Sequence, residues 1–215
     1  MSQEARFSRM EPELRKANLI EATLVCLKRH GFQGASIRKI SAEAGVSVGL
    51  ISHHYSGKDE LVAEAYRAIT GRVMGLLRDA MEHAAPSARE RLSAFFRGSF
   101  SAELLDPQLI DAWLAFWGAV RTAESINLAH EHSYGEYRGI LRKVLTELAQ
   151  EEGWEHFDAD LAAISLSALL DGLWLESGLN PGTFTPEQGI QICEAWVDGL
   201  QAGGRQRFCV QTTGC

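Results

Sequence analysis

The 215-residue sequence predicts an all-α protein. No stretch sustains the alternation of apolar and polar residues that marks a strand, and the boundaries between apolar segments carry helix caps and prolines rather than hairpin turns. We therefore expect a three-helix N-terminal head at residues 1–57 and a larger helical body at residues 58–203 that begins with a long connecting helix. Residues 204–215 are polar and are expected to form a flexible tail.

The helices of the head are bounded by short polar residues and glycines. A first helix begins at Pro12 and ends before Gly31, because proline suits a first helical turn and glycine suits a helix end. Hydroxyls at Ser36 and Ser47 can cap the next two helices, which are short. The expected helices here are 12–30, 36–44 and 48–55.

The helices of the body are bounded by the same kinds of residue. The run from Ser56 to Asp59 resembles a capping box, Pro86 marks the end of the long helix, and Thr185 precedes a helix-starting proline. The expected helices are 58–83, 87–105, one that begins at Pro107, 124–152, 158–178 and 186–202.

Residues 36–61 are typical of a DNA-binding helix-turn-helix. Gly45 permits a sharp turn after the first short helix, Val46 can plug the corner, and the second short helix can enter a major groove. Phosphate contacts are expected from Ser36, Ser47, Tyr55 and Lys58, and contacts with base edges from Val48, Ser52, His53 and His54, while Gly49 leaves room for a phosphate. Packing inside the head is the alternative for Tyr55, and a solvated helix start is the alternative for Lys58.

Residues 45–49 also match the G-x-S-x-G pattern of hydrolase nucleophile elbows, with Ser47 as the nucleophile. Such an elbow needs a buried strand before the serine, whereas a charged helix is expected there. We therefore expect no catalytic residue and no enzyme activity, and keep a Ser47 esterase only as an alternative.

The charge is unevenly distributed along the chain. Its net charge is −7, yet the first 60 residues hold nine Lys and Arg against seven Asp and Glu, whereas the remainder holds 12 against 21. A mildly basic head on an acidic body fits a protein that approaches phosphates with one end only. Arg6 and Arg9 are candidates for a minor-groove arm or for a disordered tail.

The composition indicates a cytoplasmic protein without a cofactor. The N-terminus lacks an apolar signal sequence, and the apolar stretch 161–175 falls short of the roughly 20 residues that span a bilayer. The four cysteines show no C-x-x-C spacing, and a bridge between Cys209 and Cys215 is left open. His130 and His132 stand two apart and do not share a helix face, so no metal site is expected.

With this organisation the chain resembles the TetR family of one-component repressors. The resemblance is strongest at residues 51–61 (ISHHYSGKDEL), where a recognition helix is followed by an aromatic residue and a Lys-x-Glu-Leu-like helix start; His53 departs from the family's usual aromatic. Residues 112–117 (AWLAFW) and 169–175 (LLDGLWL) are similar to the branch of choline-responsive repressors of glycine betaine synthesis. The resemblance implies a homodimer on a near-palindromic operator, released by a small effector that shifts the connecting helix.

The effector implied by that branch is choline or another cationic amine. Tryptophan attracts cations through its ring face, so Trp113 and Trp117, four residues apart, are candidates for an aromatic cage, with core packing as the alternative. The candidate effector residues are Trp113, Phe116, Trp117, Tyr134, Tyr137, Asp171 and Trp174, with Asp171 or Glu176 as the anionic partner; an uncharged apolar effector is the other possibility. The apolar helix 158–178 and Ile190, Cys193, Trp196, Val197 and Leu200 of the last helix are expected to form the dimer interface.

Overall fold

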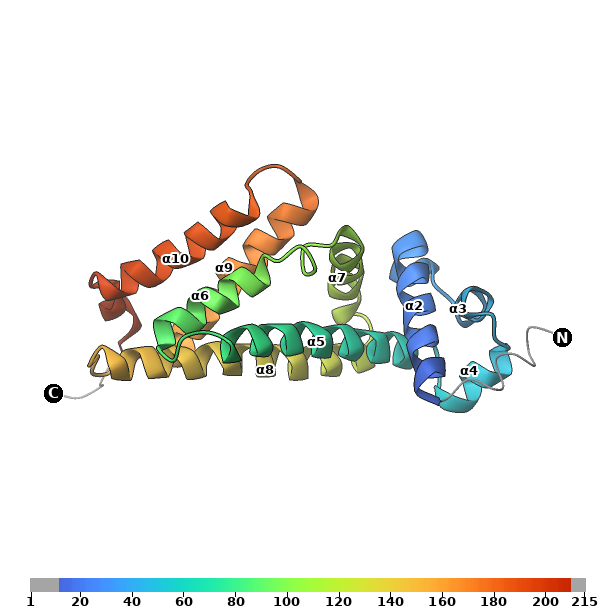
Figure 1. Cartoon of the computed structure of the whole chain (residues 1–215). Helices are drawn as coiled ribbons and strands as arrows, with labels where there is room; N and C mark the ends of the chain where they lie inside the picture. The colour runs from blue at the N-terminus through green and yellow to red at the C-terminus, as the bar shows by residue number, and fades with distance from the viewer. Residues whose placement is uncertain (1–11, 210–215) are drawn as a thin grey trace. The chain divides into compact units, whose positions relative to one another are not determined.

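The computed structural model describes residues 12–209, and within this range it is helical and contains no β-strand. The predicted all-α class is thus confirmed. The elements, labelled in Figure 1, are α2 (Pro12–Gly34), α3 (Ile37–Ala44), α4 (Val48–His54), α5 (Lys58–Glu82), α6 (Ala88–Ser99), α7 (Pro107–Val120), α8 (Glu124–Glu151), α9 (Ala159–Leu179), α10 (Pro186–Gln201) and the 3-10 helix η1 (Gly204–Phe208).

Two compact units make up the chain. The first comprises the residues up to Arg72 together with Asp111–Ser133, and the second comprises Val73–Ile110 together with the residues from Tyr134 onward. Three helices, α5, α7 and α8, contribute residues to both units. From the sequence we expect functional boundaries at residues 57/58 and 203/204. They divide the chain by role rather than by compact unit, and they stay a prediction.

The core of the first unit is built from α2 to α5 and the parts of α7 and α8 that belong to it. Ile40, Ile51 and Tyr66 have no exposed surface. The Ser133 hydroxyl donates to the Thr70 hydroxyl at 3.0 Å, a buried contact between α8 and α5. At the surface the Lys16 ammonium lies 2.5 Å from the Glu64 carboxylate, which links α2 to α5.

The second unit packs α6 against the later helices. Phe95 and Phe96 of α6 are fully buried. Arg89 donates to the carboxylates of Glu194 and Asp198 on α10 and so joins the edges of these two helices. Nearer the start of α10, Gly189 lies close to Phe100, since a Cβ on Gly189 would come within 2.6 Å of the Phe100 ring.

Helix α6 is shorter than the sequence predicts. It ends at Ser99 rather than near residue 105, and the backbone then turns, with Leu104 and Leu105 N–H groups donating to the Ser101 carbonyl at 3.1 and 2.9 Å. Phe100, the first residue after the helix, is 3% exposed and its ring lies 6.4 Å from that of Phe184. We attribute the early end to this long-range packing, which the local sequence does not encode.

The last described residues, Gly204–Cys209, form a folded segment that we call the C-terminal clasp. The Phe208 ring lies 6.0 Å from Trp196 and 6.5 Å from Phe157, and the Phe208 carbonyl accepts a hydrogen bond from the Asp158 N–H at 2.5 Å. This corrects the expectation of a flexible tail for residues 204–209, because aromatic packing holds them. Cys209 is exposed, and Cys215 lies outside the described residues, as do Arg6 and Arg9.

Candidate DNA-binding and effector sites

The α3–α4 pair has the geometry of a helix-turn-helix. Ser36 and Ser47 cap the two helices, since their hydroxyl oxygens accept from the N–H groups of Lys39 and Leu50 at 3.3 and 3.2 Å. Between the helices, Gly45 adopts the left-handed conformation (φ 68°, ψ 32°), which an L-residue with a side chain rarely adopts. The Val46 N–H then returns to the Ser41 carbonyl at 2.9 Å, so the turn is closed by hydrogen bonds on both sides.

The buried face of this pair holds it against α2. Ile40, Ala44 and Ile51 are buried. The side-chain amide of Asn18 on α2 donates to the Ala44 carbonyl at 2.9 Å, which satisfies one of the free acceptors at the end of α3. The Asn18 bond thus anchors α3 to α2, and α4 is held by the buried Ile51 and by the closed turn, while its exposed side chains are not needed for this.

The outward face of α4 is bare. Val48 is 41% exposed, and Gly49, Ser52, His53 and His54 are exposed as well. The imidazole rings of His53 and His54 lie 5.0 Å apart, edge to face. The structure thus exposes, within the described residues 12–209, all five of the residues that the sequence predicts for this helix.

Tyr55 and Lys58, the two remaining candidates, are half-buried. Burial raises the pKa of the Tyr55 phenol, and the nearby Glu64 carboxylate raises it further. The Lys58 ammonium donates to the Phe32 carbonyl at 2.9 Å and lies 4.0 Å from the centre of the Phe32 ring. Both side chains therefore have a role inside the head, and contacts with phosphate remain predictions. The sequence gives no sign of the Phe32 contact, because it joins positions 26 residues apart.

Ser47 is not arranged as a nucleophile. Its hydroxyl is engaged as the cap of α4, and α3 and a left-handed turn come before it rather than a strand. The esterase alternative is therefore not favoured.

Three of the candidate effector residues, Trp113, Phe116 and Trp117, lie in the first unit around Tyr66. The Tyr66 ring meets those of Trp113 and Phe116 edge to face at 5.4 and 5.0 Å, and Trp113 lies 6.2 Å from Trp117. The Tyr66 hydroxyl is hydrogen bonded to His130 Nδ1 at 2.9 Å. The sequence does not predict a contact between Tyr66 and His130, which lie 64 residues apart, and only the three-dimensional structure pairs them.

The other four candidates lie in the second unit. The Tyr137 ring lies 5.7 Å from Phe95 and 6.2 Å from Tyr134. Trp174 donates its indole N–H to the Ser99 carbonyl at 2.9 Å. Burial raises the pKa of Asp171 to about 6, although a hydrogen bond with Tyr134 and the charge of Arg138 act in the opposite direction. Burial also raises the pKa of Tyr137, helped by the neighbouring Asp171 carboxylate.

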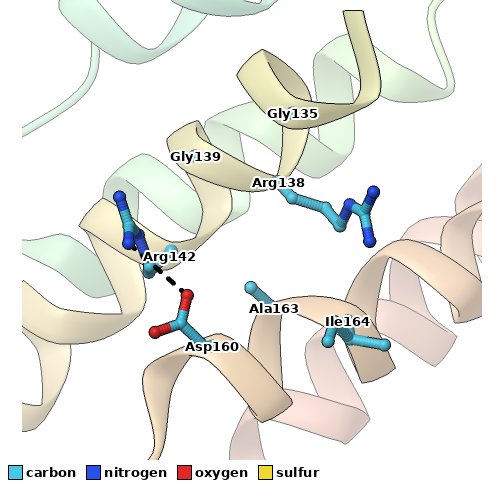
Figure 2. Close-up of a pocket in the computed structure, with 7 residues that line it drawn as sticks. All are labelled: Gly135, Arg138, Gly139, Arg142, Asp160, Ala163 and Ile164. Atoms are coloured by element: carbon cyan, nitrogen blue, oxygen red, sulfur yellow. Dashed lines mark hydrogen bonds and ion pairs between the residues drawn. The ribbon is translucent and has the colours of Figure 1, made fainter. Parts of the chain in front are cut away.

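A groove of about 260 Å³ lies between α8 and α9. Figure 2 shows Arg138 and Arg142 projecting from α8, with Arg142 directed toward Asp160 and Arg138 extending beside Ile164. The Arg142–Asp160 pair is long, at 3.5 Å, and both side chains are exposed. Two guanidinium groups repel a cation, so this groove does not suit the cationic effector that the sequence implies.

Helix α9 has a second, outward apolar face. Leu161, Ile164, Leu175 and Leu179 are all exposed, at successive spacings of three, eleven and four residues that follow one side of a helix. The helix runs to Leu179, so by length and composition it could cross a membrane, with a mean hydropathy of 1.2 in its most apolar window. The helix is thus longer than the predicted apolar stretch 161–175, but length and composition alone do not distinguish a membrane span from an apolar helix of a helical bundle.

Helix α10 turns a different face outward than the sequence predicts. Cys193, Val197 and Leu200 are at most 2% exposed because they pack into the core of their own unit, where burial raises the pKa of the Cys193 thiol to about 12. Ile192, by contrast, is 41% exposed. An amphipathic pattern does not tell a core face from an interface face, which is why the three residues were misassigned. Among residues 12–209 no group of three potential ligands is placed to hold a metal ion.

Two family models match the chain. One, described as "Bacterial regulatory proteins, tetR family", matches residues 19–65, which include the helix-turn-helix. The other, described as "BetI-type transcriptional repressor, C-terminal", matches residues 88–202.

Individual proteins match over most of their length. The HTH-type transcriptional regulator BetI of Escherichia coli (strain K12 / DH10B) is 35% identical over 172 residues, covering 78% of this chain and 84% of the relative. A crystal structure of a transcriptional regulator from Pseudomonas aeruginosa PAO1 is 75% identical, with a TM-score of 0.94, and covers 96% of this chain and 100% of that one. A regulator from Saccharomonospora viridis, solved in complex with choline, shares the fold at 22% identity, with a TM-score of 0.72 and coverage of 90% and 98%.

Proposed function

Since the chain belongs to the TetR family of bacterial regulators and carries a BetI-type repressor domain, we propose that it represses transcription in the cytoplasm as an effector-controlled homodimer. The observation that carries the proposal is the α3–α4 pair, whose backbone is capped and closed while the outward face of α4 is left bare. A short capped helix whose outward side chains are exposed can enter a DNA groove.

On DNA, the contacts divide by position along the helix-turn-helix. The caps Ser36 and Ser47, together with Tyr55 and Lys58, are proposed to meet phosphate oxygens and fix the register. Val48, Ser52, His53 and His54 are proposed to meet base edges, with Val48 suited to a thymine methyl group, while Gly49 admits a nearby phosphate.

For the dimer, we propose that the outward apolar face of α9 packs against the same face of a second copy. Burying Leu161, Ile164, Leu175 and Leu179 would remove an apolar stripe from water, and a two-fold interface uses the same patch on both subunits. On α10, Cys193, Val197 and Leu200 are buried within the protomer. We therefore propose that the exposed Ile192 contributes to the interface in their place. Two recognition helices related in this way imply a near-palindromic operator.

For the effector, we propose that Asp171 is the anionic partner of a cationic amine such as choline, with Tyr134 and Tyr137 as aromatic neighbours. A carboxylate that burial holds partly protonated gains most from a cation, because the cation restores the charged form. The regulator from Saccharomonospora viridis, of the same fold, was solved with choline, and this supports the class of ligand. Trp174 of the same unit remains a candidate wall of this site, and Trp113, Phe116 and Trp117 of the first unit remain candidate effector residues in their own right.

Release from DNA requires a difference in affinity. A ligand can dissociate the complex only if it binds the DNA-free conformation more tightly than the DNA-bound one. A coupling of about 1–3 kcal/mol would weaken operator binding by roughly 5- to 150-fold.

The test uses a duplex selected by the purified protein from a randomised DNA library. Binding of this duplex is measured by fluorescence anisotropy with and without saturating choline, for the native protein, Asp171→Asn, and the control Asp160→Asn, which changes an exposed carboxylate of the same helix. We expect choline to release the duplex from the native protein and the control but not from Asp171→Asn. Failure to select any duplex would reject the DNA-binding function; selection followed by binding that choline leaves unchanged would reject choline alone.

A further inference from the structure

The paired imidazoles of the recognition helix have a property beyond base contact. His53 and His54 are both exposed and lie in the last turn of α4, with their rings edge to face at 5.0 Å. The partial negative charge at a helix C-terminus favours an imidazolium there, and so do DNA phosphates. Histidine is the side chain that ordinarily changes charge between about pH 5 and 8.

Several charged groups of the neighbouring segments, α3 and the start of α5, form contacts with other parts of the protein. On α3, Glu43 is paired with Arg29 at 2.8 Å, while Lys39 donates to the Gly34 carbonyl. At the start of α5, Lys58 donates to Phe32, and Glu60 accepts from the Ser56 N–H at 2.6 Å. Arg38 and Asp59 are exposed, and no ion pair joins any of these groups to either imidazole within residues 12–209.

We propose, resting on the DNA-binding function above, that His53 and His54 couple operator binding to proton uptake, so that the protein holds its operator more tightly at mildly acidic pH. The two rings lie 5.0 Å apart, so both would approach the same stretch of DNA. Against DNA, the phosphates that flank the groove attract both imidazolium charges while the rings meet base edges. Binding therefore draws protons from solution, and by linkage a lower pH strengthens binding.

The experiment measures affinity for the library-selected duplex and for an unselected duplex of equal length, at a series of pH values and salt concentrations. For the native protein we expect affinity to rise about tenfold from about pH 8 to about pH 6. The slope of log affinity against log salt should steepen at the acidic end by up to about 0.9 for each imidazolium that meets a phosphate.

Matched variants separate this effect from others. In His53→Gln/His54→Gln the pH dependence should disappear, whereas His132→Gln, which removes an exposed histidine of α8, should keep it. Duplex binding by the native protein that does not vary with pH, or variation that persists in the double variant, would overturn the proposal while leaving the DNA-binding function intact. Absence of any duplex binding at every pH would overturn both.

Discussion

The helix-turn-helix and the group around Asp171 achieve their chemistry in opposite ways. In the first, the contacts that cap the helices and close the turn lie within a few residues: Ser36 with Lys39, Ser41 with Val46, Ser47 with Leu50. In the second, Asp171 depends on Tyr134 and Arg138, more than thirty positions earlier in the chain, and on burial by other helices. A DNA-binding surface can thus be built from local backbone rules, whereas a site that alters the pKa of a carboxyl needs the folded body around it.

The largest expected effect comes from removing the support under the recognition helix. Ile51 has no exposed surface, so Ile51→Ala should lower the free energy of unfolding by about 2–5 kcal/mol and abolish duplex binding. Choline binding, measured by calorimetry at a temperature where the protein is folded, should persist. Urea unfolding gives the stability, with Leu128→Ala as the exposed control. Joint loss of both binding activities in folded protein would show that the two regions are not independent.

The second effect, on Asp171, depends on pH. Its pKa of about 6 in the folded state exceeds the 3.8 of an ordinary aspartate, so the folded state holds a proton that the unfolded chain loses. Stability must therefore fall as pH rises from about 4 to about 6, and above that the cost reaches about 3 kcal/mol at most.

Asp171→Asn should remove this cost. We expect the variant to be more stable than the native protein at about pH 7.5 and indistinguishable from it near pH 4. Thermal unfolding across this range checks the prediction. An equal difference at both pH values would mean that hydrogen bonding to Tyr134, rather than ionisation, sets the energy of this site.

The smallest effect separates stability from binding within the head. A Cβ on Gly49 would meet only the Ser47 hydroxyl, at 3.9 Å, so Gly49→Ala should fit and should stabilise the protein by about 0.5–1 kcal/mol. If a phosphate approaches this position, duplex affinity should nevertheless fall. Gly135→Ala, on an exposed and open position of α8, should raise stability without changing duplex binding. Unaltered affinity in Gly49→Ala would remove Gly49 from the interface.

Features built from contacts between nearby residues could be predicted from the sequence, whereas features built from contacts between distant residues could not. Helix starts at Ser36, Ser47, Ser87 and Thr185 could be predicted because a cap is a bond between a side chain and a backbone three residues on. The end of α6 could not, since Phe100 is held by distant aromatic packing.

The sequence also did not predict which face of a helix is buried, or which distant side chains meet. The hydrophobic pattern of α10 marks one apolar face but does not say whether the core or a partner covers it, and Cys193 proved to face the core. Tyr66 and His130 meet only because α5 and α8 lie against each other in the first unit. All the candidate DNA and effector residues, by contrast, were chosen for their chemistry, and whether they bind remains to be measured.

The C-terminal clasp has a consequence for synthesis of the protein. The Asp158 N–H finds its acceptor on Phe208, fifty positions later, and the rings of Phe157 and Trp196 are covered from the same segment. While the chain is still being translated, the junction between α8 and α9 therefore keeps an unsatisfied donor and bare aromatic surface. The ribosome must release Phe208 before this part of the body can close, and a messenger truncated before codon 208 would yield a protein that never does.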